Sequence, residues 1–195
     1  MKIYILRHEE RTIDASFFGP LTKNGILNSI NLIPILEKLN INKIYCSPFI
    51  RTLQTILPYS KKKNIKLNLE YGLVEIQHPD IIAPKGVKVE LPDYLEDEFN
   101  KNTNYASIIK TYELQYPEDD KLLERRTKKI LKRIIESNYK STDNILIVTH
   151  QGLCKNILKI VNNSFVIDTE YINEYKTGTV SLIFDTNKWV YKKIN

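Results

Sequence analysis

Residues 144–152 have the sequence NILIVTHQG, and this stretch decides the fold. Its first five residues, 144–148, form the most apolar strand candidate of the chain, and a helical pattern follows over residues 152–161. A buried strand that passes directly into a helix is typical of α/β proteins, in which helices cover a largely parallel sheet. Ligands of such sheets bind beyond the carboxyl ends of the strands. We therefore expect His150, which follows this strand, to lie at a ligand-binding edge.

Alternating strand and helix patterns recur through most of the chain. The expected strands are residues 2–6, 43–46 and 66–69, and the expected helices are residues 22–39, 47–62 and 119–139. Thr22 and Ser47 are predicted helix N-caps, and Pro34 is a predicted kink. Residues 165–193 are expected to form two or three strands, with Gly178 near a turn. The pattern predicts an α/β fold, a three-layer sandwich whose mostly parallel central sheet is flanked by helices.

The composition fits one folded unit. The chain has 195 residues, of which 42% are hydrophobic and 27% charged, and only 6 are Gly and 8 are Pro. These values argue against low-complexity linkers, and we expect residues 1–195 to form a single domain. Residues 76–118 break the alternation of strands and helices, because prolines and charges are dense there. We interpret them as an insertion of loops and short helices over one end of the sheet.

The net charge of +6 raises the question of a nucleic-acid partner. The lysines are scattered, however, and runs such as residues 61–63 and 128–129 are typical of solvated helix faces, so a nucleic-acid partner is not favoured. No segment has the apolar length of a membrane span or of a signal-peptide core, which predicts a cytoplasmic protein without a membrane partner. Cys46 and Cys154 lie far apart, lack metal-ligand spacing and are predicted to be reduced.

Two of the three histidines follow predicted strands. His8 follows the first strand between Arg7 and Arg11, and His150 follows the apolar strand described above. If both strands are central and parallel, the two imidazoles emerge at the same edge of the sheet and share one pocket with the arginines. Gly152, at the start of the next helix, would leave room for an anion to approach backbone N–H groups.

Five short segments recur in the order of a known enzyme family. They are RHE at 7–9, PLTKNG at 20–25, IYCSPFIRTLQT at 44–55, LEYGLVE at 69–75 and VTHQG at 148–152. Together they resemble the histidine phosphatase (phosphoglycerate mutase-like) superfamily over most of the chain, with residues 76–118 matching least. Residues 8–11 and 45–48 are most similar to the phosphatase domain of the suppressor-of-T-cell-signalling proteins. One departure is Glu9, where the superfamily usually has Gly. A carboxylate there would repel an anionic substrate if it faced the pocket, and if it points away only the backbone geometry changes.

The resemblance implies a role for each of these residues in phosphoryl transfer. His8 would be the nucleophile and form a phosphohistidine, while its other ring nitrogen donates to a carbonyl. Glu75 would be the general acid, with Glu70 and His78 as rivals. The remaining predicted site residues would bind the phosphoryl group: Arg7, Arg11, Arg51, a protonated His150 and Gln151. Because arginines supply the positive charge, neither a metal nor a cofactor is expected.

The resemblance favours a phosphomonoesterase, a phosphatase that acts through phosphohistidine on a phosphorylated small molecule or a phosphoprotein. Two alternatives stay open: a phosphotransferase of the phosphoglycerate mutase type, and a non-catalytic phosphate-binding module on the same fold. Mutases of the superfamily carry extended motifs around the first histidine that this chain lacks. Retention of both histidines and both core arginines argues against a non-catalytic module. The natural substrate and the oligomeric state are not predicted, and a homodimer is one candidate.

Overall fold

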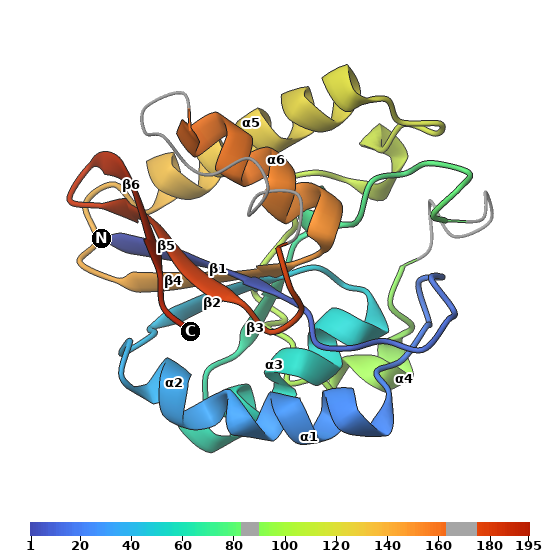
Figure 1. The fold of residues 1–195 in the computed structure, drawn as a ribbon, viewed down its shortest axis with the longest axis horizontal. Helices are drawn as coiled ribbons and strands as arrows, with labels where there is room; N and C mark the ends of the chain where they lie inside the picture. The colour runs from blue at the N-terminus through green and yellow to red at the C-terminus, as the bar shows by residue number, and fades with distance from the viewer. Residues whose placement is uncertain (83–89, 163–174) are drawn as a thin grey trace.

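The computed structural model describes residues 1–82, 90–162 and 175–195 (Figure 1). The strands are β1 (Lys2–Arg7), β2 (Lys43–Cys46), β3 (Leu67–Leu69), β4 (Asn144–Thr149), β5 (Val180–Asp185) and β6 (Lys188–Lys193). The longer helices are α1 (Lys23–Asn31), α3 (Ile50–Lys63), α5 (Asp120–Ser137) and α6 (Gln151–Asn162). Shorter helical segments are α2 (Ile33–Glu37), η1 (Tyr71–Leu73), α4 (Asp93–Glu96) and η3 (Thr111–Glu113). The strands predicted ahead of residue 150 are all present, each end within one residue of its expected place.

The strands form one sheet in the order β3-β2-β4-β1-β5-β6. Strands β3, β2, β4 and β1 are parallel to one another. Strand β5 pairs antiparallel with β1, and β6 pairs antiparallel with β5. Helices α1, α2 and α3 lie on one face and α5 and α6 on the other (Figure 1). The predicted three-layer α/β fold with a mostly parallel sheet is therefore confirmed. Arg7 pairs with Thr149 and Cys46 with Val148, so the chain leaves β1, β4 and β2 at nearly the same level.

The parallel strands are apolar along most of their length because helices cover both of their faces. Ile3, Ile5, Ile145 and Ile147 are fully buried in this core, and so are both cysteines. The cysteines are free, as predicted. Burial raises the pKa of both thiols above the ordinary value, which keeps them protonated and unreactive.

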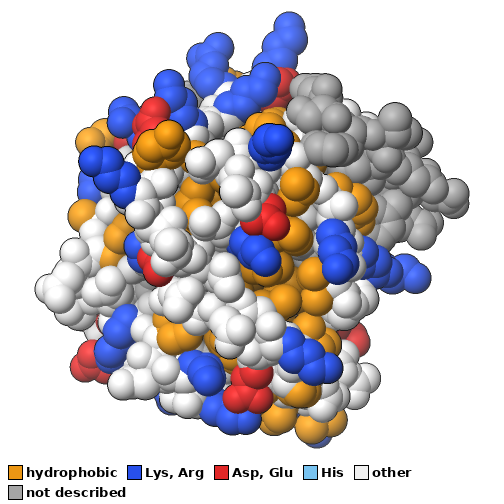
Figure 2. Space-filling model, turned by 90° about the vertical axis from the view of Figure 1, so that its left-hand side faces the viewer, with side chains coloured by type: hydrophobic (Ala, Val, Ile, Leu, Met, Phe, Trp, Pro, Cys, Tyr) orange, Lys and Arg blue, Asp and Glu red, His pale blue; other side chains and the backbone are white. Residues whose placement is uncertain are grey.

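The edge strand β6 carries Lys188, Lys192 and Lys193. Lysines on an edge strand oppose pairing with a second chain. Figure 2 shows the side of the molecule that lies on the left in Figure 1, where basic side chains are scattered and acidic side chains lie among them. The lysines at 61–63 and 128–129 are exposed, which confirms the predicted solvated helix faces. On this side, positive charge is not gathered into one patch.

The buried face of α1 differs from the prediction. The apolar repeat that predicts a helix over residues 22–39 includes Ile26 and Ile30, yet these side chains are 40% and 50% exposed. The buried residues of α1 are Gly25 and Ser29, and this helix packs against α3. The buried positions of α1 are therefore small residues, with Gly25 against the carbonyl oxygen of Glu10, and the two isoleucines face outward.

One of the two predicted helix caps is confirmed. Thr22 caps α1, because its hydroxyl accepts the backbone N–H of Gly25 at 3.0 Å. Ser47 is not a cap, since α3 begins only at Ile50. The hydroxyl of Ser47 is hydrogen-bonded to the imidazole of His150 instead, as described below.

The segment interpreted as an insertion, residues 76–118, contains α4 and η3 among its described residues, and residues 83–89 lie outside them. At the tail, the predicted turn is present, since Gly178 has a φ of +68° just before β5. The beginning of the predicted tail strands falls on residues 163–174, which are not among the described residues. None of the described helices combines the length and apolar character needed to cross a membrane.

Candidate active site

His8 follows β1 directly and is almost fully buried. Its backbone N–H donates to the carbonyl of Thr149 at 2.9 Å, and its Nδ1 lies 2.6 Å from the carbonyl oxygen of Glu9. A carbonyl only accepts, so Nδ1 carries the proton and Nε2 keeps its lone pair. Burial and, next, the charge of Arg51 lower the pKa of His8 to about 3. The imidazole is therefore neutral, in the tautomer that the sequence predicts for a nucleophile.

The loop after His8 is held by residues of the PLTKNG and SPFIRTLQT segments. The backbone N–H of Glu9 donates to Oγ1 of Thr55 at 2.9 Å, and the backbone N–H of Thr22 donates to the carbonyl of Glu10 at 2.9 Å. A Cβ at Gly25 would lie 2.2 Å from that same carbonyl oxygen, so the close approach requires glycine. These contacts explain why segments distant in sequence accompany the first histidine.

His150 follows β4, and its ring centroid lies 5.2 Å from that of His8. The sequence prediction that both imidazoles share one site is thus met. Nε2 of His150 is 2.8 Å from the hydroxyl of Ser47, and its ring packs against Phe49 at 4.9 Å between centroids. Nδ1 is buried without a partner. Ser47 and Phe49 were not predicted as site residues, although both lie in the SPFIRTLQT segment.

The predicted protonation of His150 belongs to the phosphate-bound state, and the ligand-free protein differs from that state. Burial lowers the pKa of His150 well below its ordinary value, and the nearby charge of Arg51 lowers it further. The imidazole is therefore neutral before a phosphate enters. If the Ser47 hydroxyl donates to Nε2, the ring proton lies on Nδ1, where it is available to a phosphoryl oxygen.

Arg51 lies in the first turn of α3 and is 1% exposed. Its guanidinium stacks over the ring of Phe49 at 4.6 Å, and its Nη1 donates to the carbonyl of Ser16 at 2.8 Å. Burial lowers the pKa of Arg51 to about 10, which still leaves the group charged at neutral pH. The aromatic platform and the carbonyl contact fix the plane of the guanidinium, as forked recognition of a phosphoryl group requires.

Arg7 and Arg11 lie near this group. Nη1 of Arg7 donates to the carbonyl of Tyr175, and Nη1 of Arg11 donates to the carbonyls of Thr12 and Ile13. Both arginines act electrostatically on His8, and Arg11 also lowers the pKa of Arg7 and Arg51. The three predicted arginines therefore place positive charge around one imidazole.

Within the described part of the chain, three buried nitrogen atoms of this site have no hydrogen-bond partner: Nε of Arg7, Nε of Arg51 and Nδ1 of His150. Buried polar atoms almost always have a partner, since desolvation without compensation costs about 1–3 kcal/mol. Three such nitrogens within one cluster of basic side chains are a feature of a site that binds an anion.

Glu75 is buried beside this cluster. Its Oε1 accepts the backbone N–H groups of Gly152 and Ile76, each at 3.0 Å. Burial raises the pKa of Glu75 above the ordinary 4.5, although Ile76 N–H and then Arg51, Arg126 and Arg7 oppose this. A Cβ at Gly152 would lie 2.5 Å from Oε1. Gly152 was expected to leave room for a ligand anion at the start of α6. The room is occupied instead by the carboxyl group of Glu75, so this expectation is wrong.

The rival residues have other surroundings. The Glu70 carboxylate accepts hydrogen bonds from Tyr105, Ser107, Gly72, Ile108 and Ile109, so it organises the loop beyond β3. His78 is 41% exposed in its side chain and lies 3.4 Å from an Asp80 oxygen. Gln151 is the first residue of α6, next to His150. The charges of Arg51 and Arg7 act directly on Glu75, which places this predicted acid beside the arginines.

Glu9 points away from the phosphate-binding cluster. Its carboxylate is buried against Gly178, where a Cβ would lie 2.1 Å from Oε1, and it interacts with the side chain of Asn28. Burial raises the pKa of Glu9, and no arginine of the site contributes to this shift. The carboxylate therefore does not face the incoming anion, and the departure from glycine changes only the support behind His8.

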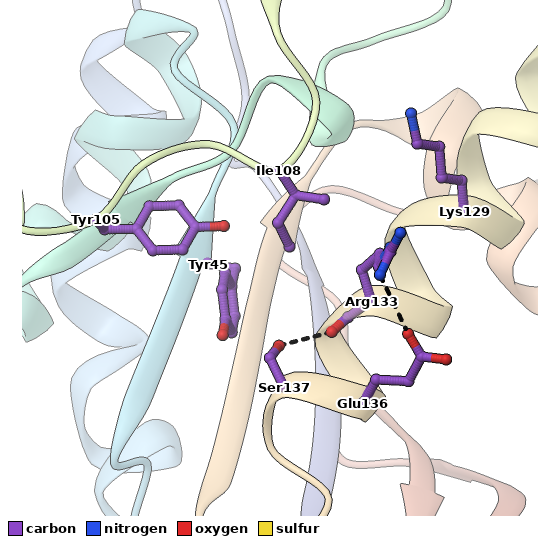
Figure 3. Close-up of a pocket in the computed structure, with 7 residues that line it drawn as sticks. All are labelled: Tyr45, Tyr105, Ile108, Lys129, Arg133, Glu136 and Ser137. Carbon is purple, nitrogen blue, oxygen red and sulfur yellow. Dashed lines mark hydrogen bonds and ion pairs between the residues drawn. The ribbon is translucent and has the colours of Figure 1, made fainter.

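A cavity of about 770 Å³ lies away from this centre, between β2, the loop at residues 105–108 and α5 (Figure 3). Tyr45 and Tyr105 line one side, with ring centroids 5.6 Å apart, and Lys129 and Arg133 line the other. None of the predicted phosphate-binding residues reaches it. Among the described residues, no group of three or more His, Cys, Asp or Glu side chains is arranged to hold a metal ion.

These groups define a candidate phosphotransfer centre at the carboxyl edge of the parallel sheet. It consists of a neutral, oriented imidazole, a second imidazole, three arginines and a buried carboxyl group. The family model of the histidine phosphatase superfamily (branch 1) matches residues 3–195. The chain belongs to this superfamily. No curated protein matches it.

Solved structures share the fold at low sequence identity. The ecdysone phosphate phosphatase of Bombyx mori, in complex with tungstate, has a TM-score of 0.74 at 15% identity, covering 98% of this chain and 92% of that one. The alpha-ribazole phosphatase of Shigella flexneri has a TM-score of 0.66 at 18% identity, covering 100% and 96%. A phosphoglycerate mutase of Bacillus anthracis has a TM-score of 0.67 at 18% identity, covering 99% and 92%. Such likeness shows the architecture, and the chemistry has to come from the residues of the site.

Proposed function

We propose that this protein is a phosphomonoesterase that acts through a phosphohistidine on His8. The proposal rests on the three nitrogen atoms without a hydrogen-bond partner that surround His8. His8 is neutral, and its Nε2 has a lone pair with which to attack phosphorus. Arg7, Arg51 and, beside them, Arg11 would neutralise the phosphoryl oxygens. Within the superfamily, Arg11 supports a resemblance to the suppressor-of-T-cell-signalling type, which has an arginine at the matching position. The free, buried cysteines agree with a reducing, cytoplasmic location.

The first step forms a bond between Nε2 of His8 and phosphorus and breaks the bond between phosphorus and the ester oxygen. Glu75, protonated, gives its proton to that oxygen, so the alcohol leaves neutral. Nδ1–H of His8 donates to the Glu9 carbonyl throughout and supports the positive charge on the phosphorylated ring. Nδ1 of His150 donates to a phosphoryl oxygen, which gives this nitrogen the hydrogen-bond partner that it lacks in the ligand-free protein.

The second step returns the enzyme to its starting state. The Glu75 carboxylate takes a proton from water, whose oxygen attacks phosphorus while the bond from phosphorus to Nε2 breaks. Inorganic phosphate leaves, His8 is neutral again, and Glu75 is protonated for the next cycle. The sum is an ester plus water giving an alcohol plus phosphate. The substrate is either a phosphorylated small molecule or a phosphoprotein.

We predict a phosphoenzyme that is labile in acid and stable in base, because a phosphoramidate on imidazole has this behaviour. The protein is mixed briefly with an aryl phosphate, quenched in base and digested, and the phosphate is mapped by mass spectrometry to His8. The His78→Ala variant serves as a control that keeps the label. An acid-stable adduct, or a label on another residue, would contradict a phosphohistidine on His8. Exchange of phosphate between glycerate positions, without net hydrolysis, would favour the mutase alternative.

We predict that EDTA leaves turnover unchanged, because arginines supply the positive charge that a metal would otherwise provide. Turnover of an aryl phosphate is measured before and after dialysis against EDTA, and again after addition of Mg²⁺, Mn²⁺ or Zn²⁺. Loss of activity that one of these ions restores would count against the proposed mechanism.

A further inference from the structure

A buried ion pair joins α5 to the end of the 76–118 segment. Arg126 of α5 is 7% exposed and Glu118 is 2% exposed. Nε of Arg126 donates to Oε1 of Glu118 at 2.8 Å, and Nη2 donates to Oε2 at 2.7 Å. Two parallel bonds fix the plane of the guanidinium as well as its position.

The same guanidinium holds the segment that carries Glu75. Nη1 of Arg126 donates to the carbonyls of Gly72 and Val74, both at 2.9 Å, and Nη2 lies 3.4 Å from the carbonyl of Glu75 itself. The carbonyl of Gly72 belongs to η1, and those of Val74 and Glu75 belong to the extended residues that follow it. The backbone position of Glu75 therefore depends on these bonds, while its Oε1 is held by the N–H groups of Gly152 and Ile76.

Glu118 holds the other side of this segment. Its Oε2 accepts the backbone N–H of Gln77 at 3.1 Å, and its own N–H donates to the carbonyl of Gln77 at 2.7 Å. The side-chain amide of Gln77 in turn donates to the carbonyl of Glu75 at 2.6 Å. Residues on both sides of Glu75 are thus fixed by one pair of side chains.

The charge of Arg126 also acts on the site. Burial raises the pKa of Glu75 and Arg126 opposes this, whereas burial lowers the pKa of His150 and Arg126 adds to this. A buried ion pair is by itself weak evidence for a gain in stability, because desolvation offsets the attraction. The pair is bonded to the backbone on both sides of Glu75, at Gly72 and Val74 and at Gln77, an arrangement that stability alone does not require.

We propose that Arg126 and Glu118 are positioning residues that hold the general acid Glu75 in line with the leaving oxygen. The inference rests on the proposed function, and it deepens it by tying the end of the 76–118 segment to the catalytic centre. Neither residue touches the substrate. Both act through the backbone of residues 72–77.

The first test replaces Arg126 by Ala and compares an alkyl with an aryl phosphate. Displacement of a catalytic group by about 1 Å costs roughly 10²-fold in rate. We expect kcat for the alkyl phosphate to fall about 10²-fold and kcat for the aryl phosphate to fall less than about tenfold, because a phenolate leaves without much help from an acid. Arg125→Ala is the matched control, since Arg125 is the exposed neighbour on the same helix and carries the same charge.

The second readout is the pH profile of kcat/KM. The charged groups that face Glu75 are Arg7 from β1, Arg51 from α3 and Arg126 from α5, with the Cys154 thiol of α6 close by. Removal of the Arg126 charge raises the pKa of Glu75, so the alkaline limb moves to higher pH in Arg126→Ala. It stays in place in Arg125→Ala. A role confined to folding stability would not move this limb.

Glu118→Gln keeps the test decisive if Arg126→Ala folds poorly, and chemical rescue adds a further test where Arg126→Ala folds. Glu118→Gln keeps the shape of the carboxyl group and is expected to show a smaller loss with the same preference for alkyl substrates. Guanidinium ion is expected to restore part of the Arg126→Ala rate, because a cavity of about 400 Å³ lined by Arg126 and Glu118 opens beside the pair. Circular dichroism and thermal unfolding establish that each variant is folded.

The outcomes separate this inference from the proposed function. Suppose that phosphate is found on His8, but that the folded Arg126 and Glu118 variants lose activity equally toward both substrates or toward neither. The inference is then wrong and the proposed function stands. If no phosphohistidine forms in the unmodified protein, the proposed function fails first. A selective loss with the alkyl substrate, together with the displaced alkaline limb, supports both.

Discussion

Replacement of His8 by Ala is expected to lower turnover by at least about 10³-fold, because removal of a nucleophile that forms a covalent intermediate leaves only binding and charge stabilisation. The variant should stay folded. The backbone N–H of residue 8 keeps its bond to the carbonyl of Thr149, and the side chain contributes one hydrogen bond, from Nδ1 to the Glu9 carbonyl. Turnover of an aryl phosphate is measured beside circular dichroism of the same sample.

His78→Ala is the matched control for this experiment. The chain has three histidines, and His78 is the one that lies partly exposed beside Asp80 rather than in the cluster. We expect His78→Ala to keep full activity, which also removes it as a proton donor. A folded His8→Ala protein that retains most of its activity would exclude His8 as the nucleophile and with it the phosphohistidine.

Much of the fold could be predicted because strand and helix periods are local properties of the sequence. Strands β1, β2, β3 and β4 lie within one residue of their expected ends. The shared position of His8 and His150 could also be predicted, because both follow strands and parallel strands end at a common edge. Arg51 followed only from the resemblance, since nothing in its local sequence marks it as buried.

The errors arise where tertiary contacts override local preference. Ser47 followed by proline is a common helix start, but the imidazole of His150 competes for the hydroxyl and α3 begins later. Ile26 and Ile30 have the spacing of a buried stripe, but the buried residues of α1 are Gly25, which lies against the Glu10 carbonyl, and Ser29. Local spacing does not show how closely another segment of the chain approaches a helix.

The protonation of His150 illustrates the same limit for the site. A histidine beside a phosphoryl group is expected to be charged, but the sequence does not reveal that this ring is fully buried beside Arg51. Neighbouring positive charge and desolvation both disfavour the imidazolium. The positive charge of the ligand-free site is therefore carried by the arginines, which remain protonated under all ordinary conditions.

Replacement of Glu75 by Gln is expected to affect poor leaving groups most. General acid catalysis contributes roughly 10²–10⁴-fold, so an alkyl phosphate, which departs as a basic alkoxide, should lose most of that factor and an aryl phosphate much less. Gln keeps an oxygen that can accept the N–H groups of Gly152 and Ile76, so the change removes the proton with little disturbance of the backbone. Pre-steady-state bursts separate phosphorylation from hydrolysis, in which Glu75 also serves as the base.

The pKa of Glu75 gives this prediction a second, independent readout. Burial raises that pKa above 4.5 in the folded protein, so the folded state binds more protons than the unfolded state between the two values. The contribution of Glu75 to stability is therefore present below about pH 4.5 and is lost as pH rises through the folded-state pKa. Glu75→Gln removes this loss, so the melting temperature of the variant should gain on that of the unmodified protein as pH rises through the folded-state pKa of Glu75.

The two readouts together identify the role of Glu75. A buried general acid is expected to raise the rate, while its burial lowers stability at pH values where it is ionised. The Gln variant should therefore be slower and, above the folded-state pKa of Glu75, more stable. Its kcat/KM should also lose the alkaline limb that deprotonation of Glu75 produces in the unmodified protein. If the alkyl and aryl phosphates instead lose the same small factor in the phosphorylation burst, and the alkaline limb persists, Glu75 is not the acid that protonates the leaving oxygen.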